Sequence, residues 1–293
     1  MKRALAFTFA LTLTAFTVSS TCLASPADAV RFELNQGDGG AGSVHATFHY
    51  DDRRDRWSNS FRASDLAGLD LAGFRQPGVR PLRFAVVREA GRFDCAGNGG
   101  ASVASGNCRF TADPAFTQML VQRGIGHPTE RQAIGLVAVD AHRETIDAIV
   151  AAHYPTPSID DVLALSALRV DRGYIASLAS VGYRPATING LIEFKALKIT
   201  PEWIGGFVRA GYGTMPPEQL IQLRALDVTP DFIAGYDRIG YRHLPAETLV
   251  QLKALNITPD FVRASVPQGA ALPPVEELVQ LKLFGRHSSF GRR

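Results

Sequence analysis

The chain has 293 residues, of which 46% are hydrophobic and 20% are charged, and its formal net charge is +3. These proportions are ordinary for a globular protein of one large domain or two smaller ones. The small net charge gives no reason to expect nucleic acid as a partner. After the first 29 residues there is no apolar run of about 18 residues, so we expect no membrane span there.

Residues 1–29 have the composition of a secretory signal peptide. A basic start at Lys2 is followed by an apolar, threonine-containing run and then by small residues. This order predicts export to the periplasm or secretion, with cleavage after Ala24 or after Ala29. The alternatives are a membrane anchor and a lipid attached to Cys22.

Residues 30–112 predict a β-rich, antiparallel domain. Short runs alternate apolar and polar residues, and stretches rich in Gly, Pro and Asp separate them, which is typical of a sheet or a small sandwich. We expect the segment GFRQPGVRP, residues 73–81, to be a loop. The expected strands cover residues 30–34, 44–50, 57–61, 82–88, 91–95 and 108–111.

Cys95 and Cys108 form an even pair in a chain that we expect to be exported. Their flanks resemble two strands around a Gly-rich turn, GGASVASG, at residues 99–106. We therefore predict a disulfide that clips this hairpin, which in the chain-entropy model contributes about 3 kcal/mol of stability. A redox pair is the alternative, but the spacing is far from C-x-x-C and no helix N-terminus is evident to activate a thiolate.

Three residues of this region are candidates for ligand or metal sensing. His45 and His49 lie four apart on an expected strand and so point to one face, and Trp57 follows on the next strand. A zinc site normally takes at least three protein ligands, and a third is not evident. We expect no metal, and the alternative for both histidines is a solvated sheet face.

From Asp113 onward the sequence repeats every 29 residues without a gap. The segment TPDFIAGYDRIGY at Thr229 matches TPEWIGGFVRAGY at Thr200, and this register holds for six copies. A second motif, such as PPEQLIQLRALDV from Pro216, interleaves with it six times. A gapless repeat of this kind predicts stacked two-helix units, because a single pair cannot cover its own apolar face.

The sequence thus predicts an α+β chain in which a disulfide-clipped antiparallel β domain precedes an α-solenoid of about six 29-residue, two-helix repeats. The domains are residues 30–112 and residues 113–286, with a polar basic tail at residues 287–293. Thr or Asp caps and Pro at the first helical position mark one type of helix. Left-handed glycines are expected to end these helices, and small residues within them to allow a neighbouring helix to approach closely. The expected stops are Gly182, Gly211 and Gly240, and the small residues include Gly205, Gly206, Ala234, Gly235, Ala176 and Ser177.

Three sets of residues recur at the same spacing. The basic set is Lys195, Arg224, Lys253 and Lys282, the amide set is Gln222, Gln251 and Gln280, and the tyrosine set is Tyr154, Tyr183, Tyr212 and Tyr241. The basic and amide sets either form a face for an extended partner or are solvated residues copied with the rest of the repeat. We expect the tyrosines to pack against the neighbouring repeat, with their hydroxyls reaching water.

The alternation in Thr200-Pro201-Glu202, Gly211-Tyr212 and Leu223-Arg224-Ala225-Leu226 resembles a bacterial repeat. That repeat occurs in exported proteins and in the extracytoplasmic C-terminal part of membrane metallopeptidases of the beta-lactam antirepressor type. The resemblance covers roughly residues 30–285 and implies an exported sensor or interaction module. The peptidase itself needs a membrane domain and an H-E-x-x-H helix; the sequence holds neither, so no catalytic residue is carried over.

The function most consistent with these patterns is a non-catalytic, exported protein-interaction scaffold, because long helical arrays offer extended binding surfaces. Its partner would be an unidentified protein or peptide of the cell envelope, and no cofactor is expected. A sensing β domain with the repeats as a docking module is the alternative. An envelope hydrolase is a third hypothesis, but the sequence has no G-x-S-x-G, no zinc motif and no Cys–His candidate.

Overall fold

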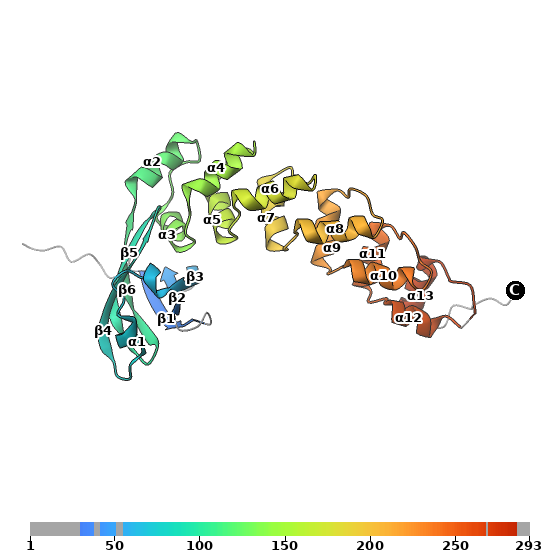
Figure 1. Cartoon of the computed structure of the whole chain (residues 1–293), viewed down its shortest axis with the longest axis horizontal. Coiled ribbons are helices and arrows are strands. Elements are labelled where there is room, and N and C mark those ends of the chain that lie inside the picture. Colours follow the sequence, from blue (N-terminus) through green and yellow to red (C-terminus); the bar gives the residue numbers. More distant parts are fainter. Residues whose placement is uncertain (1–29, 38–41, 51–54, 268, 286–293) are drawn as a thin grey trace, which may run out of the picture.

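The computed structural model describes residues 30–37, 42–50, 55–267 and 269–285. The expected signal peptide and the basic tail lie outside these residues. The chain is an α+β protein, with a six-stranded sheet at one end and helices that lead away from it in a row (Figure 1). Within the described ranges, no helix has the length and apolar character needed to cross a membrane.

The strands form one antiparallel sheet in the order β3-β2-β1-β6-β5-β4. All six predicted strands are confirmed, and most are longer than expected. Their bounds are β1 Val30–Gln36, β2 Ser43–Tyr50, β3 Asp55–Arg62, β4 Arg80–Arg88, β5 Gly91–Gly100 and β6 Val103–Ala112.

The predicted Gly-rich turn between the cysteines is wrong. β5 and β6 pair as far as Gly100 and Val103, and the turn is only Ala101 and Ser102, both with left-handed φ values of 52° and 65°. A two-residue hairpin turn of type I′ needs positive φ at both positions, although Asn-Gly is its usual sequence. The glycines of this segment therefore lie inside the strands, where they let the two backbones pair closely.

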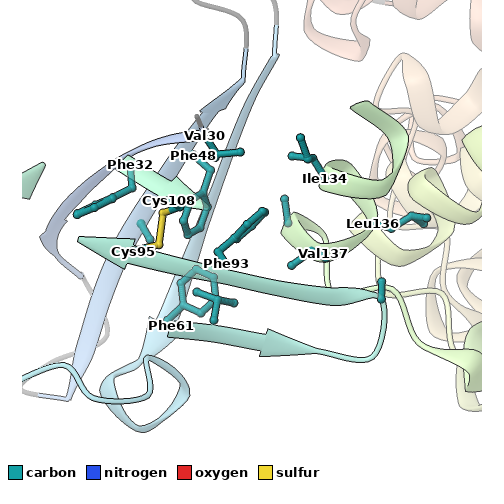
Figure 2. Close-up of a cluster of buried hydrophobic side chains, with 14 of the residues drawn as sticks. Val30, Phe32, Phe48, Phe61, Phe93, Cys95, Cys108, Ile134, Leu136 and Val137 are labelled. Atoms are coloured by element: carbon teal, nitrogen blue, oxygen red, sulfur yellow. A yellow bond between two sulfur atoms is a disulfide. The ribbon is translucent and has the colours of Figure 1, made fainter. Parts of the chain in front are cut away.

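Cys95 lies directly opposite Cys108, and the predicted disulfide joins them in the buried core of the sheet. Phe48 and Phe93 stack beside the disulfide with ring centroids 5.0 Å apart. Ile134 and its neighbours on α3 (Glu130–Ala138) pack onto the same cluster (Figure 2). The first hydrophobic core thus spans the sheet and the first helices, which joins the two parts firmly.

Part of the segment expected to be a loop is helical. The short helix α1 (Leu71–Arg75) begins where the Asp70 carboxylate accepts the Gly73 amide at 3.0 Å. Before it, the 3-10 helix η2 (Ala63–Asp65) carries the chain from β3 toward β4, where Ala67 and Ala85 exchange two backbone bonds of 2.8 Å. The two edge strands of the sheet are therefore linked at one end.

Among the described residues, twelve helices follow the sheet. They are α2 Pro114–Gln122, α3, α4 Arg143–Ala151, α5 Ile159–Ala167, α6 Arg172–Ser180, α7 Ile188–Ala196, α8 Pro201–Arg209, α9 Pro217–Ala225, α10 Pro230–Asp237, α11 Ala246–Ala254, α12 Pro259–Ser265 and α13 Val275–Phe284. Their apolar faces form a second core that begins at Ile149 and runs to the last helix.

Left-handed helix ends recur along the helical region. Gly182, Gly211 and Gly240 have the predicted left-handed φ values of 79°, 88° and 102°. A second series of left-handed helix ends was missed because most of its members are not glycine. They are Asp140, Arg169, Lys198, Asp227, Asn256 and Gly285, again 29 residues apart.

Two of the small residues within the helices make room for the next repeat, as expected. A Cβ at Gly206 would lie 2.6 Å from Cγ of Pro230, and a Cβ at Gly235 would lie 2.9 Å from Cγ of Pro259. Real Cβ atoms essentially never come within about 3.0 Å of another heavy atom. Each of these glycines is thus required by the proline that opens a helix of the following copy.

Three members of the tyrosine set crosslink neighbouring copies through hydrogen bonds, so for these three the expectation that the hydroxyls reach water is wrong. The Tyr212 hydroxyl donates to the Leu244 carbonyl at 2.7 Å, and Tyr241 donates to the carbonyl of Pro273. Tyr183 instead accepts the backbone amide of Met215 at 3.0 Å. In all three cases the partner lies 32 residues ahead, and burial raises the pKa of Tyr212 to about 12.

Candidate functional site

A cleft of about 780 Å³ lies where the sheet meets the first helices. One wall is β3, and the opposite wall comes from the ends of α3 and α5. Residues from the β4 end and from the starts of α4 and α6 complete it. Its lining comprises residues 56–60, Arg62, Asp65, Arg88, residues 138–140, His142, Glu144, Thr145, residues 166–167 and residues 169–171.

The cleft follows the open edge of β3. Trp57 and Asn59 share the core face of the sheet with the buried Phe61, whereas Ser58 and Ser60 belong to the opposite face. All except Phe61 line the cleft. A cavity lined by both faces of one strand must run along the strand's edge.

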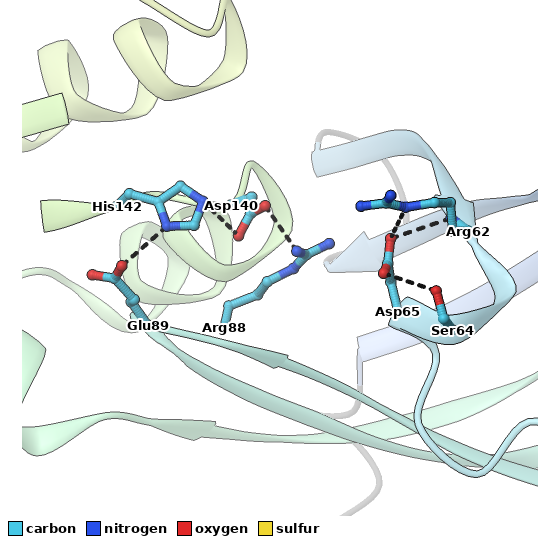
Figure 3. A network of polar contacts seen from close by, with 7 residues as sticks. All are labelled: Arg62, Ser64, Asp65, Arg88, Glu89, Asp140 and His142. Atoms are coloured by element: carbon cyan, nitrogen blue, oxygen red, sulfur yellow. Dashed lines mark hydrogen bonds and ion pairs between the residues drawn. The ribbon is translucent and has the colours of Figure 1, made fainter. Parts of the chain in front are cut away.

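A polar network ties the sheet to the helices at one end of the cleft (Figure 3). Nη1 of Arg88, on β4, donates to Oδ2 of Asp140 at 2.8 Å, and the Arg88 guanidinium carbon lies 5.3 Å from the centre of the Phe61 ring. His142 lies between two acids: its Nδ1 is 3.1 Å from Oε1 of Glu89, and its Nε2 is 3.3 Å from Oδ1 of Asp140. The network links the β4–β5 turn to the α3–α4 turn.

These contacts shift two pKa values in opposite directions. Burial lowers the pKa of His142, but its bond to Glu89 and the charges of Asp140 and Glu89 outweigh burial, so the pKa lies above 6.5. Burial raises the pKa of Glu89, but the Arg143 amide and His142 outweigh it, so the pKa lies below 4.5. Between these values the pair is an imidazolium and a carboxylate.

Three buried polar atoms around the cleft lack a hydrogen bond within the part of the chain that the structure describes. They are Nε of Arg88, Oδ1 of Asp140 and Oγ of Ser166. Asp140 Oδ1 still has the His142 ion-pair contact, and Ser166 is only 6% exposed. Buried polar groups are normally bonded, so these three atoms set the wall of the cleft apart from the rest of the core.

The arrangement suits binding. Both ring nitrogens of His142 contact carboxylates, so this imidazole is not placed to take a proton from a nucleophile. The two described cysteines are bonded to each other. Across the described ranges, no group of three or more His, Cys, Asp or Glu side chains could hold a metal ion.

The structure does not bring the three candidate sensing residues together. His45 and His49 lie on one face of β2, where His45 Nδ1 is 3.4 Å from Ser60 Oγ and His49 Nε2 is 3.7 Å from Glu33 Oε1. Trp57 is opposite Phe48 and packs on the other face, against the core. The histidine pair and the tryptophan therefore cannot contact one small ligand from the same side of the sheet.

Each member of the basic set lies over an aromatic ring of its own repeat unit. Lys195, Arg224, Lys253 and Lys282 lie 4.1, 5.4, 4.9 and 4.7 Å from the ring centres of Tyr174, Trp203, Phe232 and Phe261. Cation–π contacts of this kind hold the two helices of a unit together, and all four cations are half-buried. The amide set differs, because Gln222, Gln251 and Gln280 are exposed.

Sequence reasoning missed the network of Arg88, Glu89, Asp140 and His142. A signal was present, because His142 stands where the other copies have an Asp or Thr cap. Its side chain makes no cap bond and turns to Glu89 and Asp140 instead. A departure from the repeat thus marked a residue with a different task.

Comparison with protein-family models, with curated proteins and with solved structures gives no match for this chain.

Proposed function

We propose that this protein is an exported, non-catalytic interaction scaffold that holds a protein or peptide of the cell envelope in the cleft beside β3. The observation that carries the proposal is the cleft itself, an open strand edge facing buried polar atoms without hydrogen bonds. The disulfide and the composition of residues 1–29 support an oxidising, extracytoplasmic location.

We further infer that the helices form an α-solenoid. Support comes from features that recur every 29 residues, namely the left-handed helix ends, the cation–π contacts and the tyrosine bonds to the next copy. Contacts of this kind order neighbouring copies into one body. Such a body would hold the cleft at a fixed distance from the exposed amide set, which offers a second contact surface.

Site-specific photo-crosslinking in the producing cells tests this function. A benzophenone amino acid is placed at Ser60 in the cleft, at Gln251 in the amide set, or at Gln118 on the exposed side of α2 as a control. We expect a discrete adduct from Ser60 that is absent from Gln118. Adducts from Gln251 alone would move the binding surface to the helices, and no adduct from any position would refute the scaffold function.

A further inference from the structure

We propose that the occupant of the cleft is an extended peptide segment, which adds to the open edge of β3 as a seventh strand. This inference rests on the proposed function and names the kind of partner and its binding mode.

The Ala63 amide, just beyond β3, donates to the Gly42 carbonyl at 2.8 Å. Hydrogen-bonded pairs alternate in an antiparallel ladder, so Phe61, Asn59 and Trp57 use their backbone groups to bond β2. The backbone N–H and C=O groups of the intervening Ser58 and Ser60 then point away from β2, along the open edge.

Arg62, the next residue of β3 whose backbone should point away from β2, agrees with this alternation. The Arg62 amide is not used by β2 but donates to the Asp65 carboxylate at 3.3 Å, so a side chain covers the end of the edge. At the opposite edge of the sheet, Ala67 already bonds Ala85 of β4. Ser58 and Ser60 therefore mark the stretch of strand edge that faces the cleft and is ready to pair.

The size of the cleft restricts what can pair there. An added strand spanning Arg56 to Arg62 would be about 20 Å long, or six to seven residues. A volume of about 780 Å³ suits such a segment. A second copy of the sheet does not fit, because the ends of α3 and α5 form the facing wall.

The charged residues of the lining do not select the segment by charge. Arg62 is paired with Asp65, and Arg88 with Asp140. Within the described ranges, Arg56 and Arg169 form no ion pair, and Glu144 and Asp171 are the lining acids without one. The remaining positive and negative groups are equal in number, so recognition rests on the main-chain bonds of the added strand.

The test uses the full exported chain and a phage-displayed library of random twelve-residue peptides. The best enriched sequence is synthesised, and its affinity is measured by isothermal titration calorimetry for the native protein, Ser60→Pro and Ser60→Ala. Ser60→Pro removes the outward N–H and spares the β2 ladder, and we expect about a tenfold loss of affinity. Ser60→Ala keeps that N–H, and we expect less than about a twofold change because no main-chain bond is lost.

A second measurement leaves the protein unaltered. The peptide is N-methylated at one residue at a time, and strand addition predicts weakened binding at every second position. An enriched peptide whose binding shows this two-residue period supports the proposal. Equal sensitivity at all positions, equal affinity of Ser60→Pro and Ser60→Ala, or no enriched peptide overturns it. Crosslinking from Ser60 decides separately whether the cleft binds protein in another way.

Discussion

Gly205 and Gly206 are adjacent on α8, yet replacing each with alanine should have opposite effects on stability. At Gly206 the new methyl carbon would lie 2.6 Å from Cγ of Pro230, the first residue of α10. At Gly205 its nearest neighbour is the flexible tip of Arg209, at 3.3 Å. Only the first substitution therefore forces two copies of the repeat apart.

The comparison separates packing from helix propensity. Either alanine adds about 1 kcal/mol to the free energy of unfolding, because glycine is a poor helix former. Overpacking at Gly206 costs about 1–3 kcal/mol, since the proline ring cannot rotate away. The propensity gain cancels in the difference, so Gly206→Ala should be less stable than Gly205→Ala by about 1–3 kcal/mol.

Urea denaturation followed by far-ultraviolet circular dichroism measures this difference from the transition midpoints of the two variants. Replacing Pro230 by alanine as well should remove the clash, so that alanine at Gly206 becomes favourable in that background. Equal midpoints for the two single variants would refute the close approach of the repeats, as would an unchanged effect of Gly206→Ala when Pro230 is absent.

Three further predictions follow from the described contacts. Tyr212→Phe removes a hydrogen bond to the next copy and should lower the free energy of unfolding, obtained from urea denaturation, by about 1 kcal/mol. No change would mean that water replaces the bond without loss. Replacing Cys95 and Cys108 by alanine should cost about 3 kcal/mol, whereas a cost below about 1 kcal/mol would show that the core alone orders the hairpin. The His142 pKa is raised and the Glu89 pKa is lowered, so their pairing contributes fully to the stability of the fold between pH 4.5 and 6.5. The contribution is lost at lower pH as Glu89 takes up a proton and at higher pH as His142 loses one. His142→Asn should therefore destabilise more at about pH 5.5 than at about pH 9, and a pH-independent effect would contradict this.

The fold was predictable wherever side-chain pattern decides backbone conformation. Alternation of apolar residues gave all six strands, and the 29-residue period gave the helix pairs, with caps such as Thr229, whose hydroxyl accepts the Phe232 amide at 3.2 Å. The hairpin turn at Ala101 and Ser102 was not predictable, because neither residue type favours left-handed φ. Strand pairing across the hairpin imposes that conformation on them.

The candidate site was much less predictable, because it is built from segments that are distant in sequence. Arg88 and Asp140 are 52 positions apart, and nothing local to either indicates the other. The basic set was left with two interpretations, a binding face or solvated residues copied with the repeat. Its contacts with aromatic rings, which recur with the same period, appear only when the helices are placed.

A repeat array separates structural from functional residues in a way that single domains do not. Residues that recur in adjacent copies, such as Gly206 with Gly235 or Tyr212 with Tyr241, make the same contact with the next copy and so serve the stacking. Residues that break the pattern have no such task. His142 replaces a cap and His153 replaces a glycine at a left-handed helix end, and both belong to a copy next to the sheet. Because the cleft lies beside that copy and His142 lines it, the departures and the open edge of β3 indicate the same region for binding.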